Sequence, residues 1–510
     1  MVEFCGGMED FNVATAQESA RDGHWAMPYL GLLPRTFKPP LVHWITAIGI
    51  KLIPDSLAWG CRLPSIFVSC GLLLAVYELG RTLEDWPLGL TGAFVCGTTG
   101  MFLKFCWQAE YDLHLALWVI VTNWCLALAT FKDRRWFGCI GAGIGLGLAL
   151  MSKGFPAIAQ TLIPWAAYLA WRKWRWKIPA GRGWLAPSAI GLALLLVVAL
   201  PWTIYAFYVN HHMLHTMYSE VTLRLEASYE TRVRWHSYIV FFPLMLPWLI
   251  WFCSGFIEIV RRGRTCEKMW LALFLLVLPI AIAQPFPERR DRYLLPMVGP
   301  AALIAAYGVL RHVPRWRQWT GGQALLVAIQ GIGVIVFAAG LPIWGHLRLK
   351  TVDGQPWYDL ATTLLFCAMS LAIGTAALLV YRKTRIGFIG GTVGLMLLTN
   401  LVFLSGYRNS SNGRSDGKLL AEQILSAYPN ALIYNAAPKI RPVLPLELLI
   451  YLDRDVPSLR RPAALARADR PQVLVYPPSA DGVPPVAPPG FREFAEQKIN
   501  TGMFHVFVRE

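Results

Sequence analysis

Long apolar segments restrict what this chain can fold into more than any other feature. A helix that crosses a bilayer needs about 20 mostly apolar residues, because the hydrocarbon core is roughly 30 Å thick. About twelve such segments occur, near 64–81, 87–106, 112–131, 136–152, 155–171, 184–208, 238–260, 269–285, 293–311, 322–344, 359–381 and 386–405. Lipid offers no hydrogen-bond partner to an open backbone, so the segments should be helical. We predict an all-α polytopic membrane protein.

Basic residues alternate with the apolar segments and predict an orientation. Only 15% of the 510 residues are charged, and the net charge of +16 is spread in short bursts rather than gathered on one patch, which argues against a nucleic-acid partner. The richer bursts, at 132–135, 172–182, 261–268, 311–317 and 382–385, are expected in the cytoplasm. The opposite, outer side then carries the acidic and aromatic stretches 107–112 and 285–293. We expect the functional site there.

Three regions follow from these patterns. Residues 1–63 form an outer juxtamembrane loop region, residues 64–405 a transmembrane domain, and residues 406–510 a small extracytoplasmic α/β domain. The last region has Pro-rich turns, a helical run near 416–427 and strand-like segments Ala431–Tyr434, Val473–Tyr476 and Phe504–Val508. This orientation leaves residues 1–62 outside with no helix before them. We therefore expect a true start further upstream and a first transmembrane helix there.

The first outer region holds an acidic pair and a basic turn. Glu9 and Asp10 stand about 30 residues before Lys38, which is followed by Pro39 and Pro40. The two prolines disfavour helix where the chain leaves Lys38. A lysine held at the bilayer surface suits a lipid phosphate, although an ordinary snorkelling lysine is the alternative reading.

Two further outer stretches carry candidate site residues. Asp112 lies at the mouth of a predicted helix, where a carboxylate can act as a general base or orient a hydroxyl, or can cap the helix instead. Arg290, Arg292 and Tyr293 lie between two predicted helices, against the positive-inside trend. An arginine fork matches phosphate oxygens. Interfacial anchoring with a local Asp291 pair is the alternative.

Two metal-like patterns are weak. His211 and His215 have the spacing of a helical zinc pair, but position 212 is His where a metalloprotease motif has Glu. Asp453-Arg454-Asp455 has the DxD form of many nucleotide-sugar transferases, without a phosphate loop beside it, so chance is the better explanation. We predict no metal ligands.

Several motifs in order resemble the membrane-embedded GT-C glycosyltransferases. They are the acidic pair, the Lys-Pro-Pro turn, Arg62-Leu63-Pro64, Asp112, Leu150-Met151-Ser152-Lys153-Gly154, Leu200-Pro201-Trp202, Leu246-Pro247-Trp248 and Arg292-Tyr293-Leu294-Leu295-Pro296. The branch that the chain resembles most is the ArnT-like one, with the lipid A aminoarabinose transferases and the protein O-mannosyltransferases. That family has about thirteen helices, in agreement with a missing first one.

The resemblance implies an inverting transferase that moves a sugar from a polyprenyl-phosphate donor to a lipid A-type glycolipid, another glycan or a protein, at the outer face of a bacterial inner membrane. Lys38, Arg290, Arg292 and Tyr293 would hold the donor phosphate, and Glu9 or Asp10, with Asp112, would orient or deprotonate the acceptor. The sequence departs from the family pattern at two positions. Met8 falls on the family's usual first Asp. Phe37 replaces an acidic metal-contacting residue of the aminoarabinose transferases, so no cofactor is expected, with a divalent metal as the alternative. The competing function is a lipid or glycolipid transporter without covalent chemistry.

Overall fold

The computed structural model describes most of the chain. The described residues are 8–30, 33–35, 38–178, 183–210, 238, 241–284, 290–313, 321–349, 355–381, 385–407, 415–436, 444–457, 459, 465–466, 468–478, 484–499 and 502–510.

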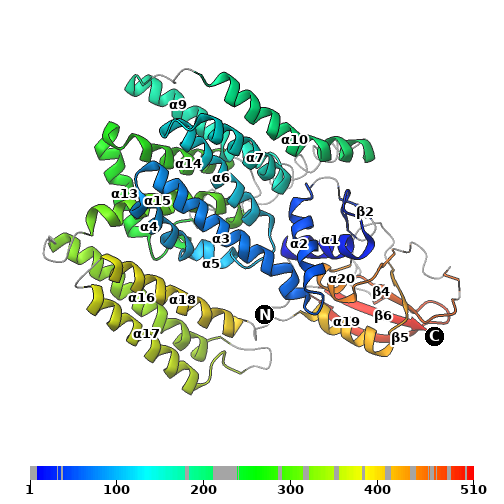
Figure 1. The fold of residues 1–510 in the computed structure, drawn as a ribbon. Helices are drawn as coiled ribbons and strands as arrows, with labels where there is room; N and C mark the ends of the chain where they lie inside the picture. Colours follow the sequence, from blue (N-terminus) through cyan, green and yellow to red (C-terminus); the bar gives the residue numbers. More distant parts are fainter. Residues whose placement is uncertain are drawn as a thin grey trace.

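Helices build the body of the molecule (Figure 1). They are α3 (Leu57–Leu83), α4 (Trp86–Gly97), α5 (Gly100–Phe105), α6 (Tyr111–Phe131), α7 (Arg135–Lys153), α8 (Pro156–Gln160), α9 (Leu162–Trp176), α10 (Leu185–Val209), α12 (Phe241–Leu244), α13 (Leu249–Arg262), α14 (Glu267–Ala283), α15 (Leu295–His312), α16 (Gly321–Leu347), α17 (Leu360–Tyr381) and α18 (Arg385–Tyr407). Among the described residues, eight helical stretches are long and apolar enough to cross a membrane. The prediction of a polytopic helical membrane protein is confirmed.

Each predicted apolar segment falls on one of these helices or on two consecutive ones. The segment 87–106, for example, is divided into α4 and α5 at Thr99, whose side chain accepts a hydrogen bond from the Phe102 backbone N–H and so caps a new helix. Hydropathy marks both halves alike and does not reveal such a break.

Helix α15 is the centre of the body. In the most apolar stretch of α15 and the turn before it, 89% of the residues are buried. In that of α10 only 17% are buried, so this helix presents its side chains to the surroundings, as a lipid-facing helix does. Close approach to α13 depends on glycine: a Cβ at Gly255 would lie 2.0 Å from the Ile304 carbonyl oxygen, and one at Gly308 would lie 2.3 Å from the Trp251 carbonyl oxygen. Small residues of this kind let membrane helices pack backbone to backbone.

The N-terminal region, for which we predicted loops, contains two helices. They are α1 (Met8–Asp22) and α2 (Leu41–Leu52), and a short hairpin of β1 (Tyr29–Leu30) and β2 (Leu33–Pro34) lies between them. Helix α1 has Glu9 and Asp10 in its first turn and Arg21 in its last, which complements the helix dipole. Its polar composition hides a helix that is largely buried against α2 and the C-terminal unit (Figure 1).

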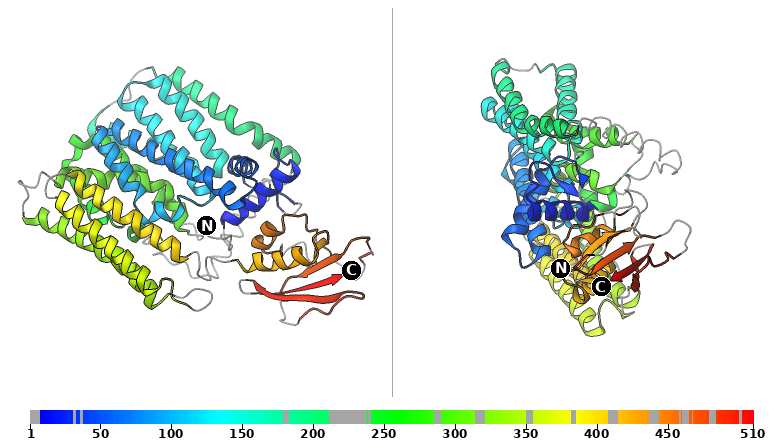
Figure 2. Two further views of the ribbon diagram at one scale, coloured as in Figure 1. Left: turned by 60° about the horizontal axis from the view of Figure 1, so that its bottom comes forward. Right: turned by 90° about the vertical axis from the view of Figure 1, so that its right-hand side faces the viewer.

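Residues 415–510 form a small α/β unit beside α1 at one end of the helical body (Figure 2). Its strands are β3 (Leu432–Asn435), β4 (Gln472–Tyr476), β5 (Arg492–Ile499) and β6 (Gly502–Arg509), in the order β3-β4-β6-β5, and only the β3–β4 pair is parallel. Two helices, α19 (Asp416–Ala427) and α20 (Leu446–Leu452), accompany the sheet. The predicted helix and three strands are present. Strand β5 was missed because this edge strand is rich in charged residues.

Candidate active site

A cluster of charged side chains lies where the start of α6, the end of α7 and the turn before α15 meet. Asp112, in the first turn of α6, forms one ion pair with Lys153 at the end of α7 and another with Arg292, whose Nε lies 3.6 Å from its Oδ2. The Lys153 ammonium also lies 4.1 Å from the centre of the Tyr293 ring. Three of the predicted site residues, Asp112, Arg292 and Tyr293, are thus brought together by Lys153.

Local backbone structure positions these groups. Lys153 is the last residue of α7, and Gly154 follows with φ +83°, a conformation that L side chains rarely adopt, so the chain turns directly after the lysine. Arg292 and Tyr293 belong to a short 3-10 helix, η3 (Asp291–Leu294), that leads into α15. The Asp291 side chain accepts a hydrogen bond from the Arg292 backbone N–H at 2.9 Å and forms an ion pair with Lys104 of α5. Arg290 directly precedes η3 in extended backbone.

Glu9 has a defined partner on α3. Arg62 donates from Nε to Oε1 and from Nη2 to Oε2 of this carboxylate, each at 2.8 Å, and the Ala109 backbone N–H donates to Oε1 at 2.9 Å. The Arg62 side chain is 1% exposed and lies over the Trp107 ring. Glu9 therefore joins α1, α3 and the segment before α6. The neighbouring Asp10 is 1% exposed.

Lys38 is connected to the neighbourhood of this site through His43 of α2. It is half-buried just before Pro39 and Pro40, and its charge acts on His43 of α2. The His43 Nε2 atom lies within hydrogen-bond distance of the Tyr111 hydroxyl, at 3.2 Å, and Tyr111 is the neighbour of Asp112. Phe37 lies outside the described residues.

Glu110 is a site residue that the sequence did not single out. It is 6% exposed, and its Oε2 atom is buried without a hydrogen-bond partner among the described residues. Burial and the nearby Asp112 carboxylate raise the pKa of Glu110 to about 7, against the opposing effect of Arg292. A carboxyl group with such a pKa exchanges protons at neutral pH.

Lys153 and Arg62 also entered the sequence prediction only as parts of motifs. Lys153 carried a usable signal, because it ends an apolar helix on the side that is poor in basic residues. Glu110 carried none that separates it from an ordinary helix-flanking residue. Arg62 faces Glu9 across 53 residues of chain, and that pairing follows only from the packing of α1 on α3.

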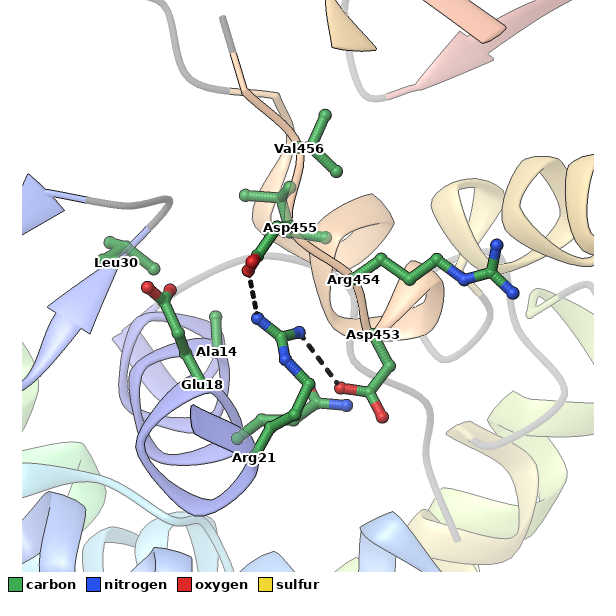
Figure 3. A pocket seen from close by; sticks show the side chains of 10 residues that line it. Ala14, Glu18, Arg21, Leu30, Asp453, Arg454, Asp455 and Val456 are labelled. Atoms are coloured by element: carbon green, nitrogen blue, oxygen red, sulfur yellow. Dashed lines mark hydrogen bonds and ion pairs between the residues drawn. The ribbon is translucent and has the colours of Figure 1, made fainter. Parts of the chain in front are cut away.

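The two metal-like patterns have separate outcomes. His211 and His215 lie outside the described residues. Asp453 and Asp455 both face Arg21 of α1, with 3.5 Å between Arg21 Nη1 and Asp453 Oδ1, and they line a cavity of about 30 Å³ between α1 and α20 (Figure 3). That volume is of the order of one water molecule. The contact accounts for the Asp-Arg-Asp pattern as a junction between two parts of the chain.

Two groups of three side chains in the described part of the chain have ligand atoms within 4.8 Å of one another: Glu18 with Asp22 and His24, and Glu493 with Glu496 and His505. Neither group contains a predicted site residue.

Residues 37–205 match the family model of the dolichyl-phosphate-mannose-protein mannosyltransferases. An undecaprenyl phosphate-alpha-4-amino-4-deoxy-L-arabinose arabinosyl transferase from Pseudomonas aeruginosa strain UCBPP-PA14 is 26% identical over 370 residues, which cover 69% of this chain and 64% of the relative. A Pseudomonas fluorescens Pf0-1 transferase of the same description is 24% identical, over 61% of this chain and 54% of its own length. The chain thus spans somewhat less than two thirds of the length of these relatives.

Solved structures show the fold over nearly the whole chain. ArnT from Cupriavidus metallidurans in the apo state superimposes with a TM-score of 0.75 and 18% identity, covering 100% of this chain and 94% of ArnT. The same protein bound to undecaprenyl phosphate gives a TM-score of 0.76 and 16% identity, over 99% and 94% of the two chains. The predicted resemblance to ArnT-like GT-C glycosyltransferases is confirmed.

Proposed function

We propose that this chain, which has the GT-C fold of ArnT, is an inverting glycosyltransferase that moves a sugar from a polyprenyl-phosphate donor to an acceptor of the bacterial envelope. The names of the similar Pseudomonas transferases and the undecaprenyl phosphate bound to the Cupriavidus protein support this class of donor. The positive-inside pattern supports a site at the outer face of the inner membrane, with the C-terminal unit on that side.

The proposal depends mainly on the Arg292 guanidinium, which has an unsatisfied donor in the described part of the chain. Its Nε is buried and has no hydrogen-bond acceptor among the described residues, because the 3.6 Å separation from Asp112 is too long for a hydrogen bond. A buried cationic donor in this state is stabilised by an anion that supplies an oxygen. A phosphate oxygen matches that requirement.

The charge of the cluster points the same way. The elements that meet here contribute four cations, Lys104, Lys153, Arg290 and Arg292. Against them stand the two paired carboxylates Asp112 and Asp291 and the partly ionised Glu110, so positive charge remains in excess. Lys38 adds another cation near His43. As the bond between the sugar C1 and the phosphate oxygen breaks, negative charge grows on the phosphate, and preorganised cations stabilise that charge.

The predicted carboxylates position the other groups of the site in this proposal. Asp112 holds Lys153 and Arg292 in place and so links donor and acceptor positions. Glu9 fixes α1 on α3 through Arg62, which places Asp10 and the start of α6. Tyr293 contacts Lys153 and packs at the phosphate side of the cluster.

The test uses the purified full chain in lipid nanodiscs with a radiolabelled polyprenyl-phosphate sugar, scored for released polyprenyl phosphate. Lys153→Met, Asp112→Asn and Lys38→Ala should each lower turnover, the first by about 100-fold, because each removes or misplaces a charge that acts in the transition state. The matched control is Lys132→Met, an exposed lysine after α6 at the opposite end of that helix. Undiminished turnover in both Lys38→Ala and Asp112→Asn would refute the assignment.

A further inference from the structure

Glu110 is a buried carboxyl group with an unsatisfied acceptor atom among the described residues. It is the residue before the first turn of α6, yet its side chain makes no capping hydrogen bond there. The side chain is 6% exposed, and Oε2 has no donor among the described residues. A buried acceptor atom without a donor is destabilising, and the cost is relieved when a donor arrives. A hydroxyl of a bound acceptor molecule would be such a donor.

Two of the carboxylates that the resemblance marks are held in ion pairs. Met8 stands where the family usually has its first Asp, and it has no acid–base function. Glu9 receives Arg62 on both carboxylate oxygens. Asp112 has Lys153 on one oxygen and Arg292 near the other, so both of its oxygens face cations. Glu110 is affected electrostatically by both of these carboxylates, and its buried Oε2 has no donor among the described residues.

Charged groups from four elements act on Glu110. They are Asp112 on α6, Glu9 on α1, Lys153 on α7 and Arg292 on η3. Burial is the largest effect on its pKa, followed by Asp112, and together they raise the value to about 7. At neutral pH a large fraction of Glu110 is therefore ionised and can accept a proton. A general base is most effective when its pKa lies close to the working pH, as here.

We propose that Glu110 is the proton acceptor of the transfer reaction and that the acceptor substrate is an alcohol hydroxyl, on a glycan or a protein side chain, rather than a phosphate. This inference rests on the proposed function. The acceptor oxygen forms a bond to C1 of the sugar while its proton passes to the Glu110 carboxylate. The C1–O bond to the donor breaks, and its electron pair leaves on the polyprenyl phosphate.

The distinction between the two acceptor classes follows from their protons and charges. A phosphate acceptor at neutral pH already has unprotonated oxygens, so it needs no base. A carboxylate in a site of low dielectric would also repel it, because like charges interact strongly there. A hydroxyl acceptor needs the base and carries no charge that the carboxylate opposes. An ionisable Glu110 thus favours hydroxyl transfer and disfavours phosphate transfer.

The experiment compares acceptors on the full chain in nanodiscs with one polyprenyl-phosphate sugar. Two probes supply hydroxyl groups: an envelope oligosaccharide and a peptide that contains serine and threonine. Comparing them distinguishes a glycan acceptor from a protein acceptor. The phosphate probe is a glucosamine-1-phosphate glycolipid. Glu110→Gln should lower hydroxyl transfer by about 100-fold, a typical loss for a general base, and Glu110→Asp should restore part of it. Glu422→Gln, an exposed residue of α19, is the control.

The pH dependence separates a proton acceptor from a merely structural residue. Wild-type hydroxyl transfer should rise as the pH passes through about 7, where Glu110 loses its proton, and the Glu110→Gln variant should lack this rise. Thermal stability gives a readout without activity. Because folding raises this pKa, stability from the protonated group is present below its ordinary value of 4.5 and is lost as the pH rises to about 7. The glutamine variant should lose less stability over that range.

Three outcomes overturn the inference and separate it from the proposed function. Wild-type transfer to the phosphate probe alone contradicts the inference and leaves the transferase assignment intact. Hydroxyl transfer that Glu110→Gln performs at the wild-type rate, with an unchanged pH profile, does the same. Release of no lipid phosphate with any acceptor contradicts both.

Discussion

At the scale of residues, carboxylates that look alike in the sequence differ in what neutralises them. Glu9 is matched by a bidentate arginine, Asp112 by a lysine, and Glu110 is left with one open oxygen among the described residues. The sequence predicted Asp112 from its place at the mouth of an apolar helix and Arg292 from its position against the positive-inside trend, whereas Tyr293 followed from the family resemblance. It could not rank Glu110 above other flanking residues, since its properties arise from burial and from neighbours on three other elements.

The Glu9–Arg62 pair leads to a prediction about stability. Glu9→Gln should destabilise the protein by about 3–5 kcal/mol, because it leaves the Arg62 charge buried and uncompensated. The double variant Glu9→Gln/Arg62→Met should recover part of that loss, since it removes the buried charge as well. Unfolding in detergent, followed by tryptophan fluorescence with Glu422→Gln as the reference, measures both. Equal stability of wild type and Glu9→Gln would contradict a structural role for the pair.

At the scale of elements, hydrophobic pattern predicted the membrane helices well and the N-terminal helix poorly. Helix α1 is mostly polar in sequence, yet ten of its 15 residues are buried because α2, α20 and the start of α6 surround it. A periodicity of apolar residues cannot reveal a helix whose buried face is polar and hydrogen-bonded, as Asn12 is to Thr46 and to the Ala109 carbonyl. The buried strands β4 and β6 could be predicted because their sequences consist mainly of apolar residues.

The junction between α1 and the C-terminal unit gives a prediction of limited size. Arg21→Ala removes contacts to Asp453 and Asp455 that are partly exposed to solvent, so it should cost less than about 1 kcal/mol. Gln17 still donates to the Ile450 carbonyl at 3.1 Å and keeps α20 in place. Hydrogen exchange of the α20 amides should accelerate by less than about fivefold, while Arg492→Ala at the far sheet edge leaves these amides unchanged. Protection lost throughout the C-terminal unit would show that the junction is essential for its fold.

At the scale of the whole molecule, the two ends of the helical body carry different chemistry. Helix α6 begins at the site with Asp112 and ends before Lys132, and α7 returns from Arg135 to Lys153. The site, α1 and the C-terminal unit share one end. Lys132, Arg135 and Arg311, which are described residues of the basic bursts that the sequence assigns to the cytoplasm, lie at the opposite ends of α6, α7 and α15. Helix order and the charge bias were readable from sequence, whereas the convergence of α3, α6, α7 and η3 on one site required the structure.

This division predicts which surfaces are reachable from outside the cell. A membrane-impermeant maleimide applied to intact spheroplasts should label Glu422→Cys in the C-terminal unit, and should label Asp133→Cys, after α6, only once the membrane is opened. Both side chains are largely exposed, at 61% and 79%, so access to the reagent is not limited by packing. The wild-type chain reports the background from native cysteines. The reverse labelling pattern would place the site in the cytoplasm.

The central claim is that the charged cluster around Asp112 breaks the bond between a sugar and a polyprenyl phosphate. The most direct test measures two products at once in proteoliposomes: polyprenyl phosphate released and sugar joined covalently to an acceptor. The account predicts equal molar amounts of both and the loss of both in Asp112→Asn. Movement of intact donor lipid between the leaflets, with neither product formed, would contradict it and identify a transporter.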